Sequence, residues 1–259
     1  MPYLRDRVFI LKSEPFREHD RRIVCFGKQH GLIEAVARGA SANSAKQAGH
    51  MVPLSEADVM IARGAAFDKL AVAHLVCAHG AARRHLGALA FVGAFFDLFI
   101  SLQRPGIVDA ECYGLLEETM RAAEALPDEP SLERAQLIFA AASLKLLDQT
   151  GFAPQLSRCA LCHDELRDGE FRQLARDGSI VHADCYRDIR AQEPNADFVS
   201  SESLTIARFL RRSGIADALL LSGSSQVFAD ASGVIFATVR HTPLFREPHG
   251  MGTIARLMR

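Results

Sequence analysis

The stretch RDRVFILKSEPFREHDRRIVCFGKQHGLIEAVARGA, residues 5–40, consists of short apolar runs separated by polar turns. Its first run alternates in polarity as a half-buried β-strand does, and Pro15 ends it. Gly31 follows Gln-His and is free to adopt the positive φ of a tight turn. Runs of this kind occupy residues 5–13, 21–28, 31–40, 52–62 and 67–76. Five short strands with turns between them predict a small β-barrel, most commonly an OB (oligonucleotide/oligosaccharide-binding) barrel.

Beyond the barrel, from residue 79, the apolar spacing becomes helical. We expect helices over residues 79–102, 109–125, 131–149 and 202–212. Ser131 is expected to cap the third of them. The phenylalanines of the first helix have helical spacing, which favours a core cluster over an aromatic cage. This cluster comprises Phe91, Phe95, Phe96 and Phe99.

The tail has a different pattern. Residues 217–240 resemble strands, with DASG at 230–233 as a hairpin turn. We therefore predict an α+β protein with an OB-fold domain over residues 1–78, whose proposed ligand is derived from its charge below, and a helical domain over residues 79–259. The helical domain is expected to contain an inserted zinc ribbon at about residues 155–190 and an atypical, strand-containing C-terminal tail.

Composition narrows the class of protein. The 259 residues are 49% hydrophobic and 24% charged, which is average for a globular protein, and the net charge is −1. Six cysteines without a secretory signal indicate a reducing compartment, so we expect a cytoplasmic protein. The most apolar stretch, residues 86–102, is interrupted by Asp97 and is shorter than the roughly 20 apolar residues of a membrane span. We expect no membrane association.

The chain has one strong metal-ligand pattern, CALCHDELRDGEFRQLARDGSIVHADC, which supplies two Cys or His pairs with two-residue gaps. The candidate ligands are Cys159, Cys162, His182 and Cys185. The intervening residues are long enough for a hairpin that returns the second pair to the first, and soft thiolates favour zinc. Two alternatives stay open: His182 is an ordinary surface histidine, or His163 competes as the ligand. An iron–sulfur cluster usually has four cysteines, and a disulfide is disfavoured under reducing conditions.

The predicted zinc site is structural rather than catalytic. Four protein ligands leave no open position for water, and three thiolates make the ion a poor Lewis acid. No Walker loop, GxSxG elbow or HExxH motif is present, and GMGTIA at 250–255 is followed by too few residues for a dinucleotide-binding unit. We therefore expect no enzyme activity. Residues 158–190 contain six arginines and seven acidic residues. The ribbon therefore has no net positive charge with which to bind DNA.

Positive charge is concentrated near the N-terminus. The first 50 residues contain nine Lys and Arg against five Asp and Glu. Arg38 and Lys46 flank the small, polar run ARGASANSAKQ, whose backbone amides can approach phosphates. The alternative is a solvated loop with incidental charges. Aromatic residues that could stack on bases are few here, which favours binding to the DNA backbone.

Together these features resemble the bacterial RecO family of DNA repair and recombination mediators. In the N-terminal stretch a strand leads to Glu18 and Asp20, then to the His30-Gly31 turn, then to a strand that ends in Arg38-Gly39. A barrel, a helical domain and an inserted zinc ribbon follow one another in the same order. The resemblance covers roughly residues 5–190. His182 departs from the four-cysteine set of many members, and the strand-like tail departs from the helices expected there.

The resemblance implies binding of single- and double-stranded DNA, annealing of complementary strands, and loading of RecA with RecR on DNA covered by single-stranded-DNA-binding protein, near the nucleoid. It places structural Zn²⁺ on the four ribbon ligands. It also implies a basic DNA face that includes Arg21, Arg38 and Lys46. The main rival is a protein-interaction scaffold that uses the zinc ribbon and has only incidental DNA contact; a metal-dependent hydrolase is a distant third.

Overall fold

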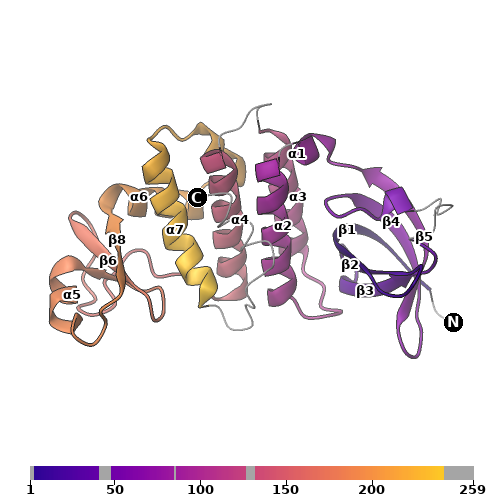
Figure 1. Ribbon diagram of the computed structural model, residues 1–259, viewed down its shortest axis with the longest axis horizontal. Helices are drawn as coiled ribbons and strands as arrows, with labels where there is room; N and C mark the ends of the chain where they lie inside the picture. The colour runs from indigo at the N-terminus through magenta and orange to yellow at the C-terminus, as the bar shows by residue number, and fades with distance from the viewer. Residues whose placement is uncertain (1–2, 41–47, 85, 127–131, 242–259) are drawn as a thin grey trace.

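The computed structural model describes residues 3–40, 48–84, 86–126 and 132–241. The molecule is elongated, with a barrel at one end, helices in the middle and a small sheet at the other end (Figure 1). Within the described ranges, no helix has both the length and the apolar character needed to cross a membrane.

The N-terminal region forms a closed barrel of five strands in the order β1-β2-β3-β5-β4. The strands are β1 (Tyr3–Pro15), β2 (Arg21–Gly27), β3 (Gly31–Ala37), β4 (Glu56–Ala62) and β5 (Asp68–Cys77). All pairings are antiparallel except the one between β3 and β5, and β1 closes the barrel by pairing with β4. A short 3-10 helix, η1 (Ala48–His50), precedes β4. This mixed five-stranded order is consistent with the expected OB-like fold.

The strands of the barrel wall bury side chains on both faces. Val8, Ile23 and Ile61 lie in the core inside the barrel. Phe9 and Phe26, on the other face, belong to the core shared with the helices, where Phe26 contacts Phe99 edge to face at 4.9 Å. Successive strand residues point to opposite faces, so the unbroken apolar run of β1 indicates a wall buried on both sides.

The middle of the molecule is a layer of packed helices. They are α1 (Gly80–Arg84), α2 (Leu86–Leu102), α3 (Ala110–Glu124), α4 (Leu132–Thr150), α6 (Ser201–Arg212) and α7 (Ser225–Arg240). Helix α4 packs against α2, α3 and α7, so it is buried on several sides. The four phenylalanines of α2 are all buried, as expected. Asp109 caps α3 by accepting from Cys112 N, whereas the expected cap at Ser131 lies outside the described residues.

The prediction of strands in the tail was wrong. Residues 215–220 form the 3-10 helix η2 (Ile215–Leu220), and residues 225–240 form α7. Ser224 caps α7 by accepting a hydrogen bond from Val227 N, and buried residues such as Phe228, Ala231 and Ile235 recur at helical spacing. The β-branched residues that suggest a hairpin are buried in α7, which packs against α4, and Gly233 lies on the exposed side of the helix, so tertiary contacts override local propensity. The tail therefore no longer departs from the helices that the resemblance implies.

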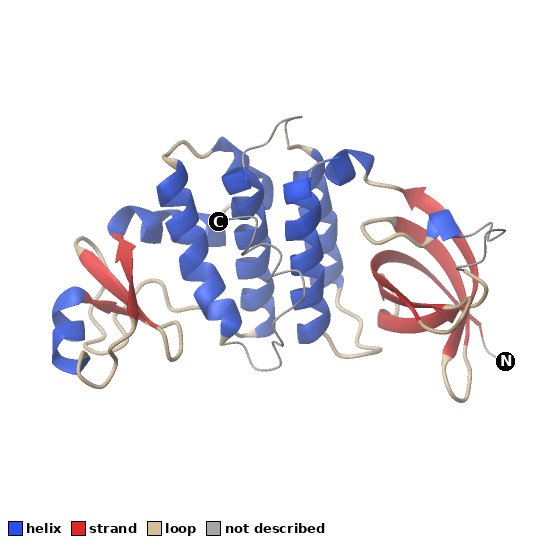
Figure 2. Ribbon diagram, viewed as in Figure 1, coloured by secondary structure: helices blue, strands red, loops and turns tan. Residues whose placement is uncertain are grey.

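The distal sheet has three antiparallel strands in the order β7-β6-β8. These are β6 (Glu170–Leu174), β7 (Ile180–His182) and β8 (Ala196–Ser200), with the short helix α5 (Ala183–Ile189) after β7. The side-chain amide of Gln173, buried, donates to Gly178 O and Val234 O, both at 2.9 Å, which attaches the sheet to α7. Figure 2 shows this sheet and α5 beyond the helices, at the end away from the barrel.

Candidate metal centre and nucleic-acid interface

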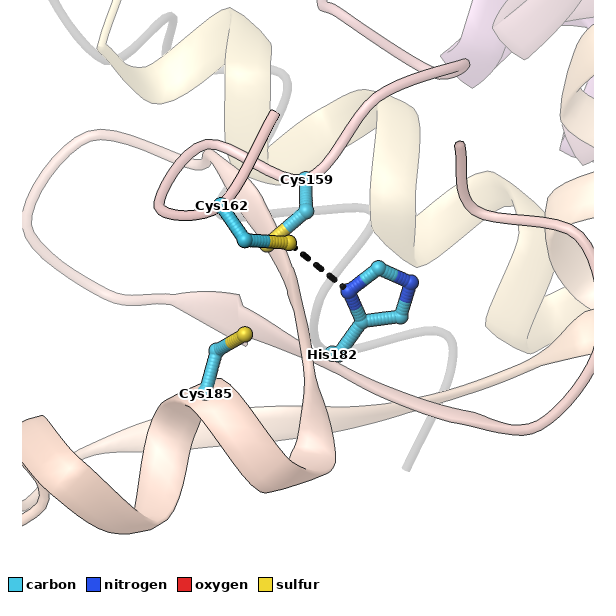
Figure 3. A group of neighbouring side chains, drawn as sticks. All are labelled: Cys159, Cys162, His182 and Cys185. Carbon is cyan, nitrogen blue, oxygen red and sulfur yellow. Dashed lines mark hydrogen bonds between the residues drawn. The ribbon is translucent and has the colours of Figure 1, made fainter. Parts of the chain in front are cut away.

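Two separate chain segments meet at the candidate metal centre. Residues 157–166 form a tight hairpin in which Cys159 N donates to Asp164 O and Leu166 N donates to Ser157 O, both at 2.9 Å. His163 N donates to Cys159 O, and His163 has a φ of +65°. These bonds curl the backbone so that Cys159 and Cys162 both face the second segment (Figure 3).

The second segment is the junction of β7 and α5. His182 ends β7 and is the N-cap residue of α5, and Cys185 lies in the first turn of that helix. Ala160 N donates to Ile180 O at 3.0 Å, which joins the hairpin to β7. The intervening residues form the β6–β7 hairpin, which returns the second pair of ligands to the first, as the spacing suggests.

The structure brings all four predicted ligand side chains together. Their ligand atoms lie within 4.8 Å of one another, and Cys162 Sγ is 3.4 Å from His182 Nδ1. The other ring nitrogen, His182 Nε2, is 3.3 Å from the backbone oxygen of Glu165. A metal-bound histidine usually donates its second N–H to such an acceptor, so the contact fixes the ring in the orientation a ligand needs. His163 is not part of this group.

The thiols of the cluster differ in acidity. Burial works against the thiolate of Cys159, but the backbone N–H groups of Cys162, Leu161 and His182 outweigh it and lower the Cys159 pKa to about 6. Burial and the neighbouring thiols of Cys162 and Cys159 raise the pKa of Cys185 to about 12. Cys159 therefore ionises readily to a thiolate. The neighbouring cysteines ionise as well only if a cation compensates the negative charge.

The donor set fits a zinc ion held by Cys159, Cys162, His182 and Cys185. Sulfur and imidazole nitrogen are the donors that zinc prefers, and four such ligands close a tetrahedral site. An ion bound there would supply folding free energy to the hairpin and the β7–α5 junction.

A second donor group lies where the barrel joins the helices. Cys77, His79 and Glu124 have ligand atoms within 4.8 Å of one another. His79 Nδ1 is 3.0 Å from the Glu124 carboxylate and 3.7 Å from Cys77 Sγ. We assign this group to a polar link between the end of β5 and α3, because Glu124 and Cys77 both lie beside the same ring nitrogen of His79, Nδ1; the other ring nitrogen, Nε2, is buried and has no hydrogen-bond partner among the described residues.

Strand register brings two of the predicted DNA-binding residues, Arg21 and Arg38, to one rim of the barrel, which we call the loop rim. Arg21 begins β2 and pairs with both Pro15 and Ala37, the last residues of β1 and β3. Arg38 follows directly and is exposed. The guanidinium of Arg21 donates to Ser13 Oγ and Ser13 O, at 2.8 and 2.6 Å, which leaves other N–H groups for a ligand. Lys46 lies outside the described residues.

The motif residues of the N-terminal stretch fix the backbone at both rims of the barrel. The Asp20 carboxylate accepts from Gly39 N at 2.9 Å, which joins the β1–β2 loop to the end of β3. At the opposite rim, the Asp6 carboxylate accepts from His30 N and lies 3.0 Å from His30 Nδ1. Gly31 has a φ of +64°, and a Cβ there would lie 1.9 Å from Ile107 O. These residues therefore act through backbone geometry.

The loop rim also carries residues that sequence reasoning did not single out. Arg17, in the β1–β2 loop, lies over the rings of Phe16 and Phe67, with its Cζ 5.2 and 5.3 Å from their centroids. Phe67 belongs to the β4–β5 loop and is distant in sequence. The signal available from sequence was the aromatic residue beside each predicted turn, but only the closed barrel brings the two loops together.

A closed five-stranded barrel of OB-like order at one end of a layer of helices, with four Cys and His side chains that could hold a metal ion at the other end, defines a mixed α/β protein with a barrel and a candidate metal centre. Family models match nearly the whole described chain: Recombination protein O N terminal over residues 1–79 and Recombination protein O C terminal over residues 83–242. The chain belongs to the RecO family of DNA repair proteins.

Similar proteins carry the same description. A DNA repair protein RecO of Anaeromyxobacter sp. (strain K) is 28% identical over 226 residues, 86% of this chain and 83% of the relative. The RecO of Gloeothece citriformis is 30% identical over 171 residues, 65% of this chain and 59% of the relative. The RecO of Desulforamulus reducens is 24% identical over 176 residues, 68% of this chain. The matches span 66% of the Desulforamulus protein and 59% of the Gloeothece protein.

Proposed function

We propose that this protein binds single- and double-stranded DNA through the loop rim and brings complementary strands together. The observation that carries the proposal is the convergence of Arg17, Arg21 and Arg38 on one rim, from the β1–β2 loop and the adjoining ends of β2 and β3. Lys46 follows in the same connection and is expected to add to this charge. Arginines grouped in this way neutralise successive phosphates of a DNA backbone.

Annealing then follows without a catalytic step. A protein that cancels the repulsion between two backbones and holds them loosely raises the rate at which complementary strands meet. Membership of the RecO family supports the further proposal that RecR and single-stranded-DNA-binding protein are partners and that the complex helps to load RecA, in the cytoplasm at the nucleoid. In this proposal zinc has a structural role at the far end of the molecule.

One observation favours the rival scaffold function. The ribbon has an exposed aromatic, Phe198, with the guanidinium of Arg172 5.1 Å from its ring centroid. Both border a surface hollow of about 490 Å³ that includes Tyr186 and Arg187. Exposed aromatic and arginine side chains are common where proteins bind one another.

The test of DNA binding is fluorescence anisotropy of a labelled single-stranded oligonucleotide at increasing salt. Five phosphate contacts give a log–log slope of about −3.5, or roughly a hundredfold loss of affinity between 50 and 200 mM salt. The variant Arg38→Ala should weaken binding and reduce the slope by about 0.7.

A matched control is Arg187→Ala, which removes an exposed arginine that pairs with Asp184 on the ribbon and should leave both affinity and slope unchanged. If the unaltered protein does not bind at low salt, or if the Arg187→Ala variant is affected as strongly as Arg38→Ala, the loop rim is not the DNA site. Strand annealing, with and without RecR, is the assay that follows a positive result.

A further inference from the structure

Two loops of the barrel present an aromatic cluster on the loop rim. Phe16 lies in the β1–β2 loop and Phe67 in the β4–β5 loop, with ring centroids 6.1 Å apart and ring planes at 70°. Arg17 lies over both rings. We call Phe16, Arg17 and Phe67 the aromatic cap.

The aromatic cap is not part of the hydrophobic core. Phe16 is 40% exposed, Phe67 is half-buried, and neither belongs to the core inside the barrel or to the core shared with the helices. Exposing a phenylalanine of this size to water is unfavourable, by about 25 cal/mol per Å² of apolar surface. The two cores therefore do not hold these rings in place; they pack on each other and on Arg17.

The loops that carry the cap are held rigidly. Phe16 N donates to Asp20 O at 3.0 Å, and the Asp20 carboxylate holds Gly39 N. In the β4–β5 loop, the Asp68 carboxylate accepts from Gly64 N and from Arg63. A Cβ on Gly64 would lie 2.2 Å from Phe67 O, so this turn is closed tightly. The cap is thus preorganised, which lowers the entropy cost of binding a ligand.

Cationic side chains border the cap, alongside the acidic Glu18 and Asp20 of the β1–β2 loop. The β1–β2 loop that carries Phe16 begins beside Arg21, because Pro15 and Arg21 are paired. Arg38 follows Ala37, the partner of Arg21 on β3. Val36 pairs with Lys69, two residues after Phe67. An aromatic surface bordered by arginine and lysine has the chemistry that binds unpaired nucleic-acid bases, since each base stacks on a ring while its phosphate meets a cation.

We propose that the aromatic cap is a stacking site for an unpaired base of single-stranded DNA, with the neighbouring phosphates held by Arg21 and Arg38. The inference rests on the proposed DNA binding and extends it, because it gives the loop rim a preference for single-stranded over duplex DNA. A base in a duplex is already stacked on its neighbours and cannot occupy the cap. The cap therefore selects single strands over duplex, whereas the cations bind both.

The absence of tryptophan from the sequence allows a direct test. The variant Phe16→Trp has one tryptophan, whose fluorescence should be quenched when a poly-dT oligonucleotide stacks on it. The matched control is Phe198→Trp, because Phe198 is also exposed and also lies under an arginine, Arg172, but at the ribbon end. Its fluorescence should not change on addition of the same oligonucleotide.

The double variant Phe16→Ala/Phe67→Ala measures the contribution to affinity. Loss of one stacked base should weaken single-strand binding roughly tenfold at constant salt slope, and duplex binding should change less than twofold. Arg38→Ala, by contrast, should weaken both and lower the slope. Because both rings lie outside the cores, the thermal unfolding midpoint of the double variant should stay close to that of the unaltered protein.

The outcomes separate this inference from the function on which it rests. If the oligonucleotide binds by anisotropy, but Phe16→Trp is not quenched and the double variant binds normally, the cap is only a loop-stabilising cluster and the inference is wrong. If single-strand and duplex binding fall equally, the cap does not select single strands and the inference is also wrong. If the unaltered protein binds no DNA at low salt, the proposed function fails and the stacking site fails with it.

Discussion

The barrel and the ribbon are both small β-structures, at opposite ends of one molecule, but they are stabilised differently (Figure 1). The barrel closes on itself and has its own core, which includes Val8, Ile23 and Ile61. The ribbon sheet has three strands and no second sheet to cover it, and its buried residues Phe171 and Ile180 belong to the core of the helices. Closure satisfies the edges of the barrel, whereas the ribbon needs a neighbour and a cross-link.

The comparison shows why the candidate metal site lies where it does. The hairpin at residues 157–166 and the β7–α5 junction are joined by few backbone bonds, one of which is Ala160 N to Ile180 O. Both segments also reach the core of the helices, through residues such as Leu166 and Val181, and a ligand held by both would add a direct cross-link between them. The barrel, already closed, has no comparable need.

Removal of the proposed zinc ion should have the largest effect, confined to the ribbon end of the molecule. Cys185→Ser should lose zinc and become sensitive to protease between residues 160 and 190, because about 10 kcal/mol of binding free energy is withdrawn from the ribbon. Zinc content and mass spectrometry of the proteolytic fragments measure this. An intact ribbon without metal would contradict the structural role.

The same experiment has an internal control in the barrel. Burial raises the pKa of Cys25 to about 12, so its thiol is protonated and enclosed at neutral pH, and the thiolate fraction rises only as the pH approaches that value. Cys162 is exposed. After chelation, alkylation at pH 8 should label the ribbon cysteines and leave Cys25 unlabelled. Labelling of Cys25 would mean that the barrel also unfolds when the metal is removed.

Alanine substitutions at two glycines, at the two ends of β3, should give the next largest loss of stability. Gly31 and Gly39 have the same φ of +64°, but a Cβ at Gly31 would strike Ile107 O, and one at Gly39 meets nothing within 4 Å. Gly39→Ala should therefore cost only the strain of a left-handed alanine, about 1–2 kcal/mol.

Gly31→Ala adds a backbone collision to the same strain, and we expect a loss of about 3 kcal/mol or more. Urea denaturation of the two variants measures the difference. Equal losses would show that the β2–β3 turn is free to move away from the loop that contains Ile107, and that the barrel is less firmly attached than the contact indicates.

The smallest effect should come from Asp20 at the loop rim. Asp20→Ala and Asp20→Asn remove the same negative charge, but only Asn keeps an oxygen that can accept from Gly39 N. The alanine variant should lose about 1 kcal/mol of stability relative to the asparagine variant. It should also bind single-stranded DNA a few-fold more weakly, in the anisotropy assay. Indistinguishable variants would mean that the rim does not depend on this bond.

Much of this architecture could be predicted from local patterns. Alternation and turn residues located all five barrel strands, because strand period and turn geometry are properties of short segments. The ligand spacing placed Cys159 and His182 together, because a two-residue gap and a hairpin return leave few other arrangements. The local pattern failed for α7, where strand-like residues such as Val234 and Ile235 are helical and buried in a helix that packs on α4.

What could not be predicted depends on contacts between distant segments. Nothing around Phe67 indicates Phe16 as its neighbour until the barrel closes. Likewise, the carbonyl of Glu165 that orients His182, and the link from His79 to Glu124, join residues that only the folded chain brings together. Such contacts depend on the topology of the complete fold, which no local sequence pattern indicates.

The way in which the barrel is attached has a consequence for long polymers. Strand β3 begins at the rim that contacts residues 105–107, and β5 ends there, at the connection to α1; both strands have their other ends at the loop rim. The chain connections to the helices and the loops thus lie at opposite rims, and the wall between them packs on the helices through Phe9 and Phe26. In the proposed function the loop rim binds DNA, and because a chromosome offers no free end within reach, the strand would have to be bound sideways, in its middle. A rim that is not enclosed by the attachment allows this capture without threading.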